Sequence, residues 1–404
     1  MSKPLEGIKV LELSTFVAAP VSARLLGELG ASVIKVERPE GDQWRATGVS
    51  FLPSRFSADE NPVFDIYNSG KKHIALNLKS PEGMEVFQKL LSQADIFITN
   101  TRPKALERLG LAYEQVKDKY PGLIYAMLVG YGEKGPEATK PAFDTVAFWS
   151  KSGFLMDQAE AGERYNPVVP PASAGDTVSG MFLMGEICAA LVRKMRTGKG
   201  DFVRSGLYHN GIFTMGTMNI ICQKPFGRKY PLNRVDQGVP GGYYQCADGE
   251  WVFIAAAYAA DIIPKMCRAI ERADLLEDPD FKTAAGRWQY REKFYEIFRK
   301  AFLTKTSHEW EKLAAELDFP LERMSHYSDV YEDPQAWANE YLEHVEFKNG
   351  RVDVMPRSPL EMDSVGIPDT IPAPEVGHDT RSTLETLGYT PAQIDAMYAS
   401  GAVK

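Results

Sequence analysis

The N-terminal third of the chain alternates short apolar runs with stretches of helical periodicity, and this alternation restricts the fold more than any other feature. The apolar runs, each of strand length, are residues 7–13, 31–37, 95–100 and 123–128. Helical stretches separate them, and the two clearest are residues 20–29, which begin with Pro20 and end before Gly30, and residues 80–93. Repeated strand–helix–strand units form a parallel sheet with crossover helices. We therefore expect an α/β fold.

The remainder of the chain predicts a second, smaller domain. Its features, in order, are a long helix over 176–196, a Pro- and Gly-rich connector over 224–242, a hairpin over 243–254 with its turn at Asp248-Gly249, helical patterns over 260–317, and a Pro-rich stretch over 355–374 before a helical tail. We expect a large α/β domain over 1–224, a small α+β domain over 225–330, and a C-terminal segment, 331–404, that returns to the large domain.

Charge and composition argue against several classes of protein. The 46 Lys and Arg residues against 54 Asp and Glu residues give a net charge of −8, which disfavours nucleic acid as a partner. The four cysteines form no CxxC motif and the six histidines have no metal-ligand spacing, so neither a disulfide framework nor a metal site is expected. No signal-peptide pattern and no apolar run of about 18 residues is visible, so we expect a cytoplasmic protein without a membrane span.

Familiar nucleotide and hydrolase motifs are missing from the sequence. Glu37 ends the second predicted strand, where a ribose-binding acid would lie, but the first turn, residues 14–20, contains no glycine for close approach of a pyrophosphate. A strand-end charge is the simpler interpretation of Glu37. The sequence also has no GxxxxGK[ST] loop, no GxSxG elbow and no HExxH helix.

Basic residues gather after the predicted strands. They are Arg38 after the second strand, Lys71, Lys72 and Lys79 around ALNLK, Arg102, Lys104 and Arg108 after the third strand, and Lys134 and Lys140 after the fourth. The strand ends of an open parallel sheet form its ligand crevice, so these cations suit a phosphorylated ligand. A solvated rim of charges explains them equally well, and spacing alone leaves both interpretations open.

Asp176 is the acid that most suggests chemistry. Small residues surround it in PPASAGDTVSG, and the long predicted helix follows. One interpretation is an ordinary N-cap. The other is a functional carboxylate that the helix dipole and free N–H groups hold ionised, with Gly175 and Gly180 leaving room for a substrate.

Taken together, the segments of this chain resemble the family III CoA-transferases over nearly its whole length. The matching segments, in order, are LEGIKVLELSTFVAAP, ASVIKVERPEGD, NSGKKHIALNLKSPEG, DIFITNTRPKALERLGL, VGYGEKGP, AGDTVSG, RTGKGDFV, YYQCADGEWV and PEVGHDTRSTLETLGYTPAQI. Within the family, GYGEKGP, KYPLNR and DPQAWANEYL are most similar to the fermentative 2-hydroxyacyl-CoA transferases, which act on aryl-lactates or 2-hydroxyisocaproate.

The resemblance implies a fold, a mechanism and a set of site residues. It implies a Rossmann-like large domain, a smaller α+β domain and an interlocked homodimer. Asp176 falls on the catalytic aspartate, which carries CoA as an aspartyl thioester formed through mixed anhydrides. Coenzyme A, as acyl-CoA, is then a substrate beside a free carboxylic acid, and no prosthetic group or metal is implied. The CoA-binding positions are Val17, Ala18, Arg38, Leu76, Asn77, Lys79, Asn100, Thr101, Arg102, Arg108 and Lys140.

Some details of the site remain open at this stage. The backbone N–H groups near Gly175 and Thr177 are candidate oxyanion donors. Phe51, Phe143, Trp149 and Tyr208 are either an acyl pocket or plain core. Only Gly238-Val239-Pro240-Gly241-Gly242 stands where formyl-type enzymes have a long glycine-rich loop, which disfavours formyl or oxalate substrates.

Two rival functions share these features. A 2-methylacyl-CoA racemase of the same fold needs an acid/base pair, and racemases of this family place a His directly before an Asp. This chain has Phe143 before Asp144, and Phe143 cannot carry a proton. A non-catalytic CoA-binding protein is the second rival, and Asp176 among small neighbours argues against it.

Overall fold

The computed structural model describes residues 3–53, 56–57, 60–161, 166–255 and 261–404, and it divides the chain into two compact units. The first unit comprises Met1–Gly153, Pro170–Asn219 and Pro334–Lys404. The second comprises Phe154–Val169 and Ile220–Asp333. All the residues of the candidate site discussed below lie in the first unit.

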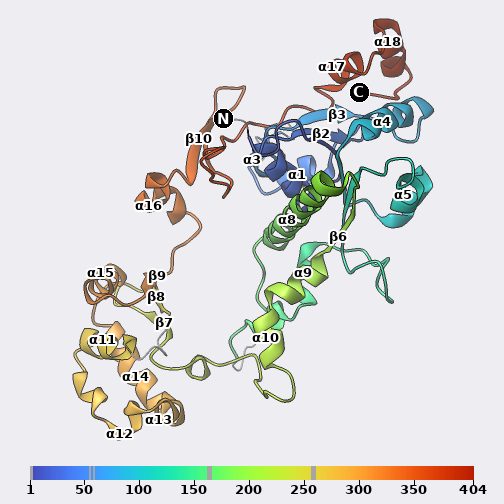
Figure 1. Ribbon diagram of the computed structural model, residues 1–404. Coiled ribbons are helices and arrows are strands. Elements are labelled where there is room, and N and C mark those ends of the chain that lie inside the picture. Colours follow the sequence, from blue (N-terminus) through green and yellow to red (C-terminus); the bar gives the residue numbers. More distant parts are fainter. Residues whose placement is uncertain (1–2, 54–55, 58–59, 162–165, 256–260) are drawn as a thin grey trace. The chain divides into compact units, whose positions relative to one another are not determined.

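The centre of the first unit is a six-stranded parallel sheet (Figure 1). Its strands are β1 (Lys9–Leu13), β2 (Ser32–Glu37), β3 (Lys72–Ala75), β4 (Ile96–Thr99), β5 (Ile124–Val129) and β6 (Phe202–Gly206). Their order is β3-β2-β1-β4-β5-β6, with β1 paired to both β2 and β4. This is the Rossmann order, in which the carboxyl ends of β1 and β4 flank the switch point. The expected α/β fold and the four predicted strands are confirmed.

Helices and the C-terminal segment cover the sheet. One face packs against α4 (Pro81–Gln93), α17 (Thr380–Thr386) and α18 (Pro391–Ala399), whose apolar residues share one core with Leu11, Phe97 and Tyr125 of the sheet. Figure 1 shows α17 and α18, in red, beside β3 and α4. The chain end is bound there because Leu76 bridges Val403 and the Asn77 N–H donates to the Ala402 carbonyl at 2.9 Å.

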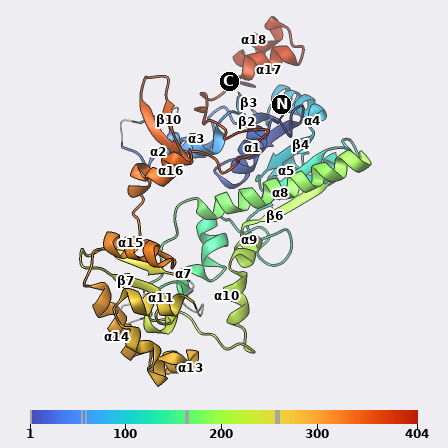
Figure 2. The same ribbon diagram turned by 60° about the vertical axis from the view of Figure 1, so that its left-hand side comes forward.

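The long helix α8 (Ala174–Thr197) packs against α1 (Ala18–Glu28) and against β5 and β6 (Figure 2). It confirms the predicted helix and begins two residues earlier. By length and composition alone α8 could cross a membrane, which the sequence analysis did not expect. Seven of its residues are buried, among them Leu183, Ile187 and Leu191.

Shorter elements complete the first unit. They are α2 (Gln43–Val49), α3 (Pro62–Asn68), α5 (Pro103–Leu109), α6 (Tyr113–Val116), the π-helix η1 (Thr145–Ser150), α9 (Leu207–Thr214), α10 (Gly216–Ile221), whose last two residues belong to the second unit, α16 (Pro334–Ala338), and the antiparallel pair β10 (Leu342–Glu346) and β11 (Val352–Pro356). The π-helix matters most for function, because such turns are frequent at functional sites.

The second unit has an antiparallel sheet, β7-β8-β9, covered by short helices. The strands β7 (Gly242–Gln245) and β8 (Trp251–Ile254) confirm the predicted hairpin around Asp248-Gly249, and β9 (Leu321–Arg323) adds a third strand. The helices are α7 (Phe154–Asp157), η2 (Val235–Gln237), α11 (Ile262–Ala269), η3 (Ala273–Leu276), α12 (Pro279–Lys282), α13 (Ala284–Gln289), α14 (Arg291–Phe302), α15 (Ser307–Leu317) and η4 (Asp329–Glu332). Phe298, Phe302 and Trp310 form the centre of its core with Tyr244. The start of the predicted helical stretch, residue 260, lies outside the described residues.

Candidate active site

Asp176 lies inside the first turn of α8 and does not cap it. The N-cap is Ser173, whose φ of +63° places it in the left-handed region that few non-glycine residues adopt. Its side chain makes no capping hydrogen bond to the helix. The interpretation of Asp176 as an ordinary N-cap is therefore wrong, and the amides of the first turn need another acceptor.

A second carboxylate, Asp144, supplies that acceptor from a different element. Asp144 directly precedes the π-helix η1 and is only 5% exposed. Burial raises the pKa of Asp144, and the backbone amides of Thr145, Asp176 and Gly175 oppose that shift. Two acids distant in sequence thus meet at the N-terminus of α8. The sequence analysis named Asp144 only as the residue after Phe143, and no local pattern indicates that it approaches Asp176.

The electrostatics of this pair differ from the sequence expectation. Burial raises the pKa of Asp176 well above its usual range, and the negative charge of Asp144 raises it further. Burial also raises the pKa of Asp144, although its hydrogen bonds oppose the shift. We expected the helix dipole to hold Asp176 ionised. That expectation is wrong because Asp144 faces the same first-turn amides and because burial disfavours the charge.

Tyr67 on α3 is the third polar group of the site. Burial raises the pKa of its phenol, and hydrogen bonds with the side chains of Thr177 and Ser173 oppose this, while Asp176 and Asp144 raise it further. Tyr67 therefore stays a neutral hydroxyl beside the two acids at neutral pH. The sequence analysis missed it, because a single Tyr in a short helix gives no signal.

The two glycines near Asp176 serve packing. A Cβ on Gly175 would lie 2.9 Å from Phe148 Cδ1 and from Trp149 Nε1. A Cβ on Gly180 would lie 1.9 Å from Val21 Cγ1 and 2.4 Å from the Ala18 carbonyl oxygen. The expectation that these glycines leave room for a substrate is wrong, because neighbouring elements fill that space.

One of the expected oxyanion donors is already engaged. The Thr177 N–H donates to the Ser173 carbonyl at 2.9 Å as part of the helix. The Gly175 amide faces Asp144. Neither of these amides points to open space in the described structure.

The first turn of the sheet is held in place by the side chains after β4. Asn100 accepts from the Thr15 N–H at 3.0 Å and donates to the Thr15 carbonyl at 2.7 Å. Thr101 donates to the Leu13 carbonyl at 3.4 Å. Phe16, which follows Thr15, has a φ of +63°, and strained residues of this kind cluster at functional sites. The turn beside the switch point is therefore fixed in a specific shape.

The predicted CoA-binding residues fall into two groups. Val17, Ala18 and Leu76 are buried. Asn77, Asn100 and Thr101 are partly buried, and their side chains or backbone amides form hydrogen bonds within the protein. Cationic side chains at the surface form the second group, namely Arg38, Lys79, Arg102, Arg108 and Lys140.

The surface cations follow strands of the one sheet. Arg38 follows β2 and Arg102 follows β4, the two neighbours of β1, and among the described residues neither has a carboxylate within ion-pair distance. The Arg108 side chain donates to the Lys104 carbonyl at 3.1 Å. Lys140 pairs with Glu137 at 3.0 Å and lies over the Tyr131 ring.

One predicted surface cation, Lys71, is in fact internal. Its Nζ lies 2.8 Å from Glu12 Oε2, and Lys35 Nζ lies 2.9 Å from Glu12 Oε1 and 2.9 Å from Asp42 Oδ2. Burial lowers the pKa of Lys71 to about 8, against the opposing charge of Glu12. Lys71 is therefore not part of the basic rim, because its ammonium group is buried and paired with Glu12.

Glu37 ends β2 as a strand-end charge, as predicted, and its side chain is buried. It is 3% exposed, and its carboxylate lies 2.9 Å from Arg45 Nε and 2.7 Å from His73 Nδ1. Burial would raise the pKa of Glu37, but these two partners outweigh it and hold the pKa below its usual range. Together with the network around Lys35, this pairing fixes the loops at the carboxyl ends of β1, β2 and β3.

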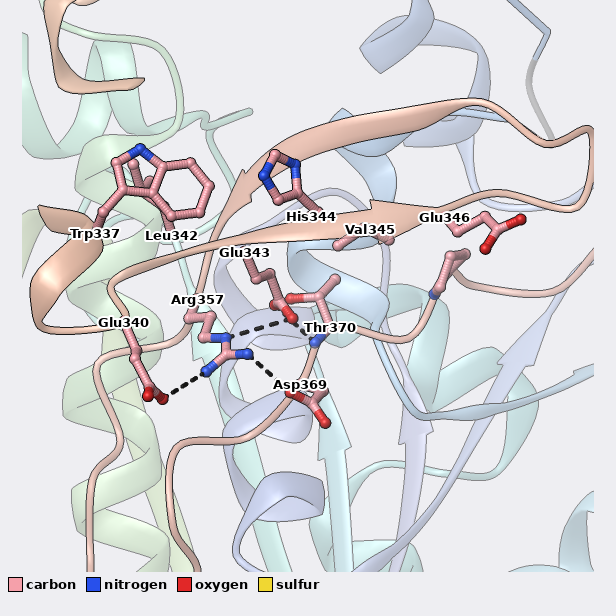
Figure 3. A pocket seen from close by; sticks show the side chains of 11 residues that line it. Trp337, Glu340, Leu342, Glu343, His344, Val345, Glu346, Arg357, Asp369 and Thr370 are labelled. Atoms are coloured by element: carbon pink, nitrogen blue, oxygen red, sulfur yellow. Dashed lines mark hydrogen bonds and ion pairs between the residues drawn. The ribbon is translucent and has the colours of Figure 1, made fainter. Parts of the chain in front are cut away.

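A separate cavity lies on the C-terminal hairpin (Figure 3). Arg357 is central to it, and its guanidinium lies 3.3 Å from Glu340, 3.4 Å from Glu343 and 3.0 Å from Asp369. No residue of the elements that carry Asp176 and Asp144 lines this cavity. Because carboxylates surround its cation, the cavity does not suit an anionic ligand.

Among the described residues, no group of three or more His, Cys, Asp or Glu side chains could hold a metal ion. The site presents two carboxylates, a phenol and a rim of surface cations, in which Lys140 is paired with Glu137. A carboxylate can act as an acyl-accepting nucleophile toward a thioester.

Comparison with known proteins agrees with this geometry. The model of CoA-transferase family III matches residues 5–380. The chain is 41% identical over 401 residues to (R)-2-hydroxy-4-methylpentanoate CoA-transferase of Clostridioides difficile, covering 99% of each chain. It is 36% identical over 394 residues to cinnamoyl-CoA:phenyllactate CoA-transferase of Clostridium sporogenes, covering 97% of this chain and 95% of the relative.

A solved structure shares the fold. The crystal structure of a mutant of Rv3272 from Mycobacterium tuberculosis superposes with a TM-score of 0.81 at 26% identity, covering 95% of this chain and 99% of that one. The resemblance inferred from the sequence motifs is thereby confirmed. The chain belongs to CoA-transferase family III and is a CoA-transferase.

Proposed function

We propose that the enzyme moves CoA between an acyl-CoA, of the enoyl or 2-hydroxyacyl type, and a free 2-hydroxy carboxylic acid. The proposal of 2-hydroxy acids as substrates rests on the two relatives, whose names specify 2-hydroxy-4-methylpentanoate and phenyllactate. The observation that carries the mechanism is Asp176, a partly buried carboxylate with a raised pKa in the first turn of α8. A more basic carboxylate is a stronger nucleophile once ionised.

In the proposed mechanism Asp176 carries the CoA group. An oxygen of the ionised Asp176 attacks the thioester carbonyl carbon, the C–S bond breaks, and CoA thiolate leaves a mixed anhydride. The thiolate then attacks the aspartyl carbonyl and releases the donor acid as its carboxylate, which gives the aspartyl-CoA thioester. The acceptor carboxylate repeats these two steps in reverse. No net proton transfer is required, and water must be excluded while the anhydride exists.

The remaining predicted residues would hold coenzyme A. Arg38, Arg102 and Arg108 supply guanidinium groups, which suit phosphate oxygens, and Lys79 and Lys140 add charge. Val17, Ala18, Leu76, Asn77, Asn100 and Thr101 shape the turns along the same sheet edge and would offer backbone contacts. Their position around the switch point, where open α/β sheets bind ligands, supports this assignment.

We further propose an interlocked homodimer in the cytoplasm. Large apolar side chains are exposed along α8 and α9, and the most exposed are Met195 at 84% and Phe213 at 71%. The rings of Phe182 and Phe213 meet edge to face across the two helices with their centroids 5.8 Å apart, so these two residues share one apolar surface. Contiguous exposed apolar surface marks protein interfaces. All four cysteines are free thiols, which suits a reducing compartment.

The test of the mechanism is the covalent adduct on Asp176. The enzyme, incubated with cinnamoyl-CoA or 2-hydroxy-4-methylpentanoyl-CoA alone, should accumulate a thioester that hydroxylamine traps and peptide mass spectrometry places on Asp176. Asp176→Asn should lower kcat by at least about a hundredfold, because losing a covalent nucleophile removes the pathway. CoA binding should persist in that variant. An Asp176→Asn enzyme that keeps more activity, or a wild type with no adduct on either donor, contradicts the proposal.

A further inference from the structure

The turn after β1, residues 14–17, takes its shape without a glycine. Phe16 in this turn has a φ of +63°, in the left-handed region that is sterically unfavourable for a bulky side chain. In the dinucleotide-binding version of a Rossmann sheet, glycines in the corresponding turn allow such a backbone. Here other contacts must hold Phe16 in this conformation.

Asp42 binds the Phe16 backbone directly. Its Oδ1 accepts from the Phe16 N–H at 3.1 Å and from the Trp44 N–H at 2.9 Å, and the second of these bonds caps α2. Asp42 is only 3% exposed, so little water competes for the two amides. One carboxylate oxygen thus fixes both the left-handed residue of the turn and the start of the next helix.

The other carboxylate oxygen of Asp42 is anchored by a buried lysine. Lys35 Nζ lies 2.9 Å from Asp42 Oδ2, 2.9 Å from Glu12 Oε1 and 3.0 Å from the Ser14 carbonyl oxygen. The side chains of Lys35 and Glu12 are fully buried. Because this ion pair is made on one oxygen of Asp42, the other oxygen is directed at the amides. The ends of β1 and β2 therefore orient the Asp42 carboxylate.

The backbone of Phe16 determines how the chain enters α1. Two of the proposed CoA contacts, Val17 and Ala18, follow directly, and Ala18 is the first residue of α1. The helix itself is fixed against α8, because a Cβ on Gly180 would meet the Ala18 carbonyl oxygen at 2.4 Å. A change of φ at Phe16 would therefore alter the turn, where the coenzyme is proposed to bind, and not the position of α1.

We propose that Asp42 is a positioning residue for coenzyme A, which holds Phe16 in the left-handed conformation and so gives Val17 and Ala18 the backbone shape that binds the ligand. The proposal rests on the proposed function, in which these two residues contact CoA. It assigns two separable roles to one carboxylate. Oδ1 shapes the turn, and Oδ2 with Lys35 stabilises the fold.

Two substitutions of Asp42 separate these roles. Two amides face Oδ1, so Asp42→Asn keeps its oxygen on that side and loses the charge that faces Lys35. Its melting temperature should fall, because a buried ion pair is broken, but its Kd for free CoA should stay near that of the wild type. Asp42→Ala also loses the acceptor for Phe16. Its Kd for CoA and its KM for cinnamoyl-CoA should rise about tenfold, the effect of losing a hydrogen bond to a charged group, while kcat changes less.

Asn61→Ala is the matched control, because Asn61 is a buried N-cap on the neighbouring helix α3. Its side chain accepts from the Val63 and Phe64 amides at 3.1 and 3.2 Å and donates to the Arg45 carbonyl at 2.9 Å. This variant should lose stability as Asp42→Ala does, without a change in Kd for CoA.

Calorimetric titration with CoA and thermal unfolding of the three variants decide between positioning and general stability. Kd values that follow the melting temperatures, with Asp42→Asn as weak a binder as Asp42→Ala, would overturn the proposal. So would a folded Asp42→Ala that binds CoA like the wild type. A wild type that binds no CoA would instead remove the proposed function itself, so the two failures are distinct.

Two variants of Phe16 test the backbone conformation even if Asp42→Ala does not fold. Phe16→Asn and Phe16→Val both remove the ring, but Asn tolerates a positive φ and the β-branched Val does not. The Kd for CoA should therefore be about tenfold higher in Phe16→Val than in Phe16→Asn. Equal Kd values in these two variants would show that the left-handed turn is unimportant for binding and would contradict the proposal.

Discussion

At the scale of single residues, Asp65 on α3 predicts how stability responds to pH. Asp65 is 3% exposed and accepts from the Ala373 N–H at 3.0 Å. Burial raises its pKa to about 7, although that hydrogen bond and nearby arginines oppose the shift. The folded pKa thus exceeds the unfolded value of about 4. The stability linked to this proton is complete below about pH 4 and is lost as the pH rises through 7.

Asp65→Asn should remove this penalty, because Asn keeps the acceptor for Ala373 without a charge. At pH 8 the variant should be more stable than the wild type by a few kcal/mol, at roughly 1.4 kcal/mol per pKa unit. Near pH 4 the gain should vanish. Urea unfolding of both proteins at pH 4.5, 6 and 8 measures this difference in the free energy of unfolding. A difference that does not change with pH would contradict the titration of Asp65.

A site residue could be predicted only where the residues next to it in the sequence form a recognisable pattern. Asp176 could be found because small residues and an apolar helix surround it in sequence. Asp144 and Tyr67 could not, because their roles depend on α3 and η1 meeting the N-terminus of α8. The burial of Lys71 and Glu37 could not be predicted for the same reason. A charged residue at a strand end is usually solvated, and here the fold buries both with partners.

At the scale of elements, the contact between α1 and α8 links the sheet to the site. Gly180 is the close-contact point, where a Cβ would meet Val21 Cγ1 at 1.9 Å and the Ala18 carbonyl oxygen at 2.4 Å. Gly180→Ala must push the helices apart, which should cost about 1–3 kcal/mol. Since the first residue of α1 is a proposed CoA contact, the KM for acyl-CoA should also rise.

Gly185→Ala is the control in the same helix, because a Cβ at Gly185 meets nothing within 4 Å. It should preserve KM and add up to about 1 kcal/mol of stability from helix propensity. Thermal unfolding and acyl-CoA saturation curves of both variants give the comparison. Equal effects of the two substitutions would show that the contact with α1 is unimportant.

The strands that could be predicted are those in the middle of the sheet. β1, β2, β4 and β5 are mostly buried, so their sequences are apolar runs. The edge strands β3 and β6 were not named as strands. β3 begins with Lys72 and His73, and β6 carries the exposed Arg204, so neither gives a clean apolar signal. The pair β10 and β11 was missed because charged residues alternate through it.

At the scale of the whole molecule, the fold class follows from local periodicity, but the path of the chain does not. The segment Pro334–Lys404 belongs to the first unit, and its last residues bind beside β3, with the Thr380 side chain donating to the Lys404 carbonyl at 2.7 Å. The segment Phe154–Val169 belongs to the second unit. The return of 331–404 was expected, but 154–169 was placed in the large domain, because that crossing depends on complementary surfaces that a sequence pattern does not reveal. By contrast, the family motifs in the sequence were sufficient to identify the class of enzyme.

The last prediction concerns the assembly. Light scattering should give a mass of twice 45.0 kDa, and urea should remove the dimer mass and the helical circular dichroism together, since interlocked chains cannot separate while folded. The unfolding midpoint should rise with protein concentration. Met195→Asp combined with Phe213→Asp should lower that midpoint, because a carboxylate buried in an apolar interface has no partner. Val352→Asp, which alters a 55% exposed residue on β11, should have little effect. A stable, active species of 45.0 kDa at assay concentration would contradict the interlocked dimer.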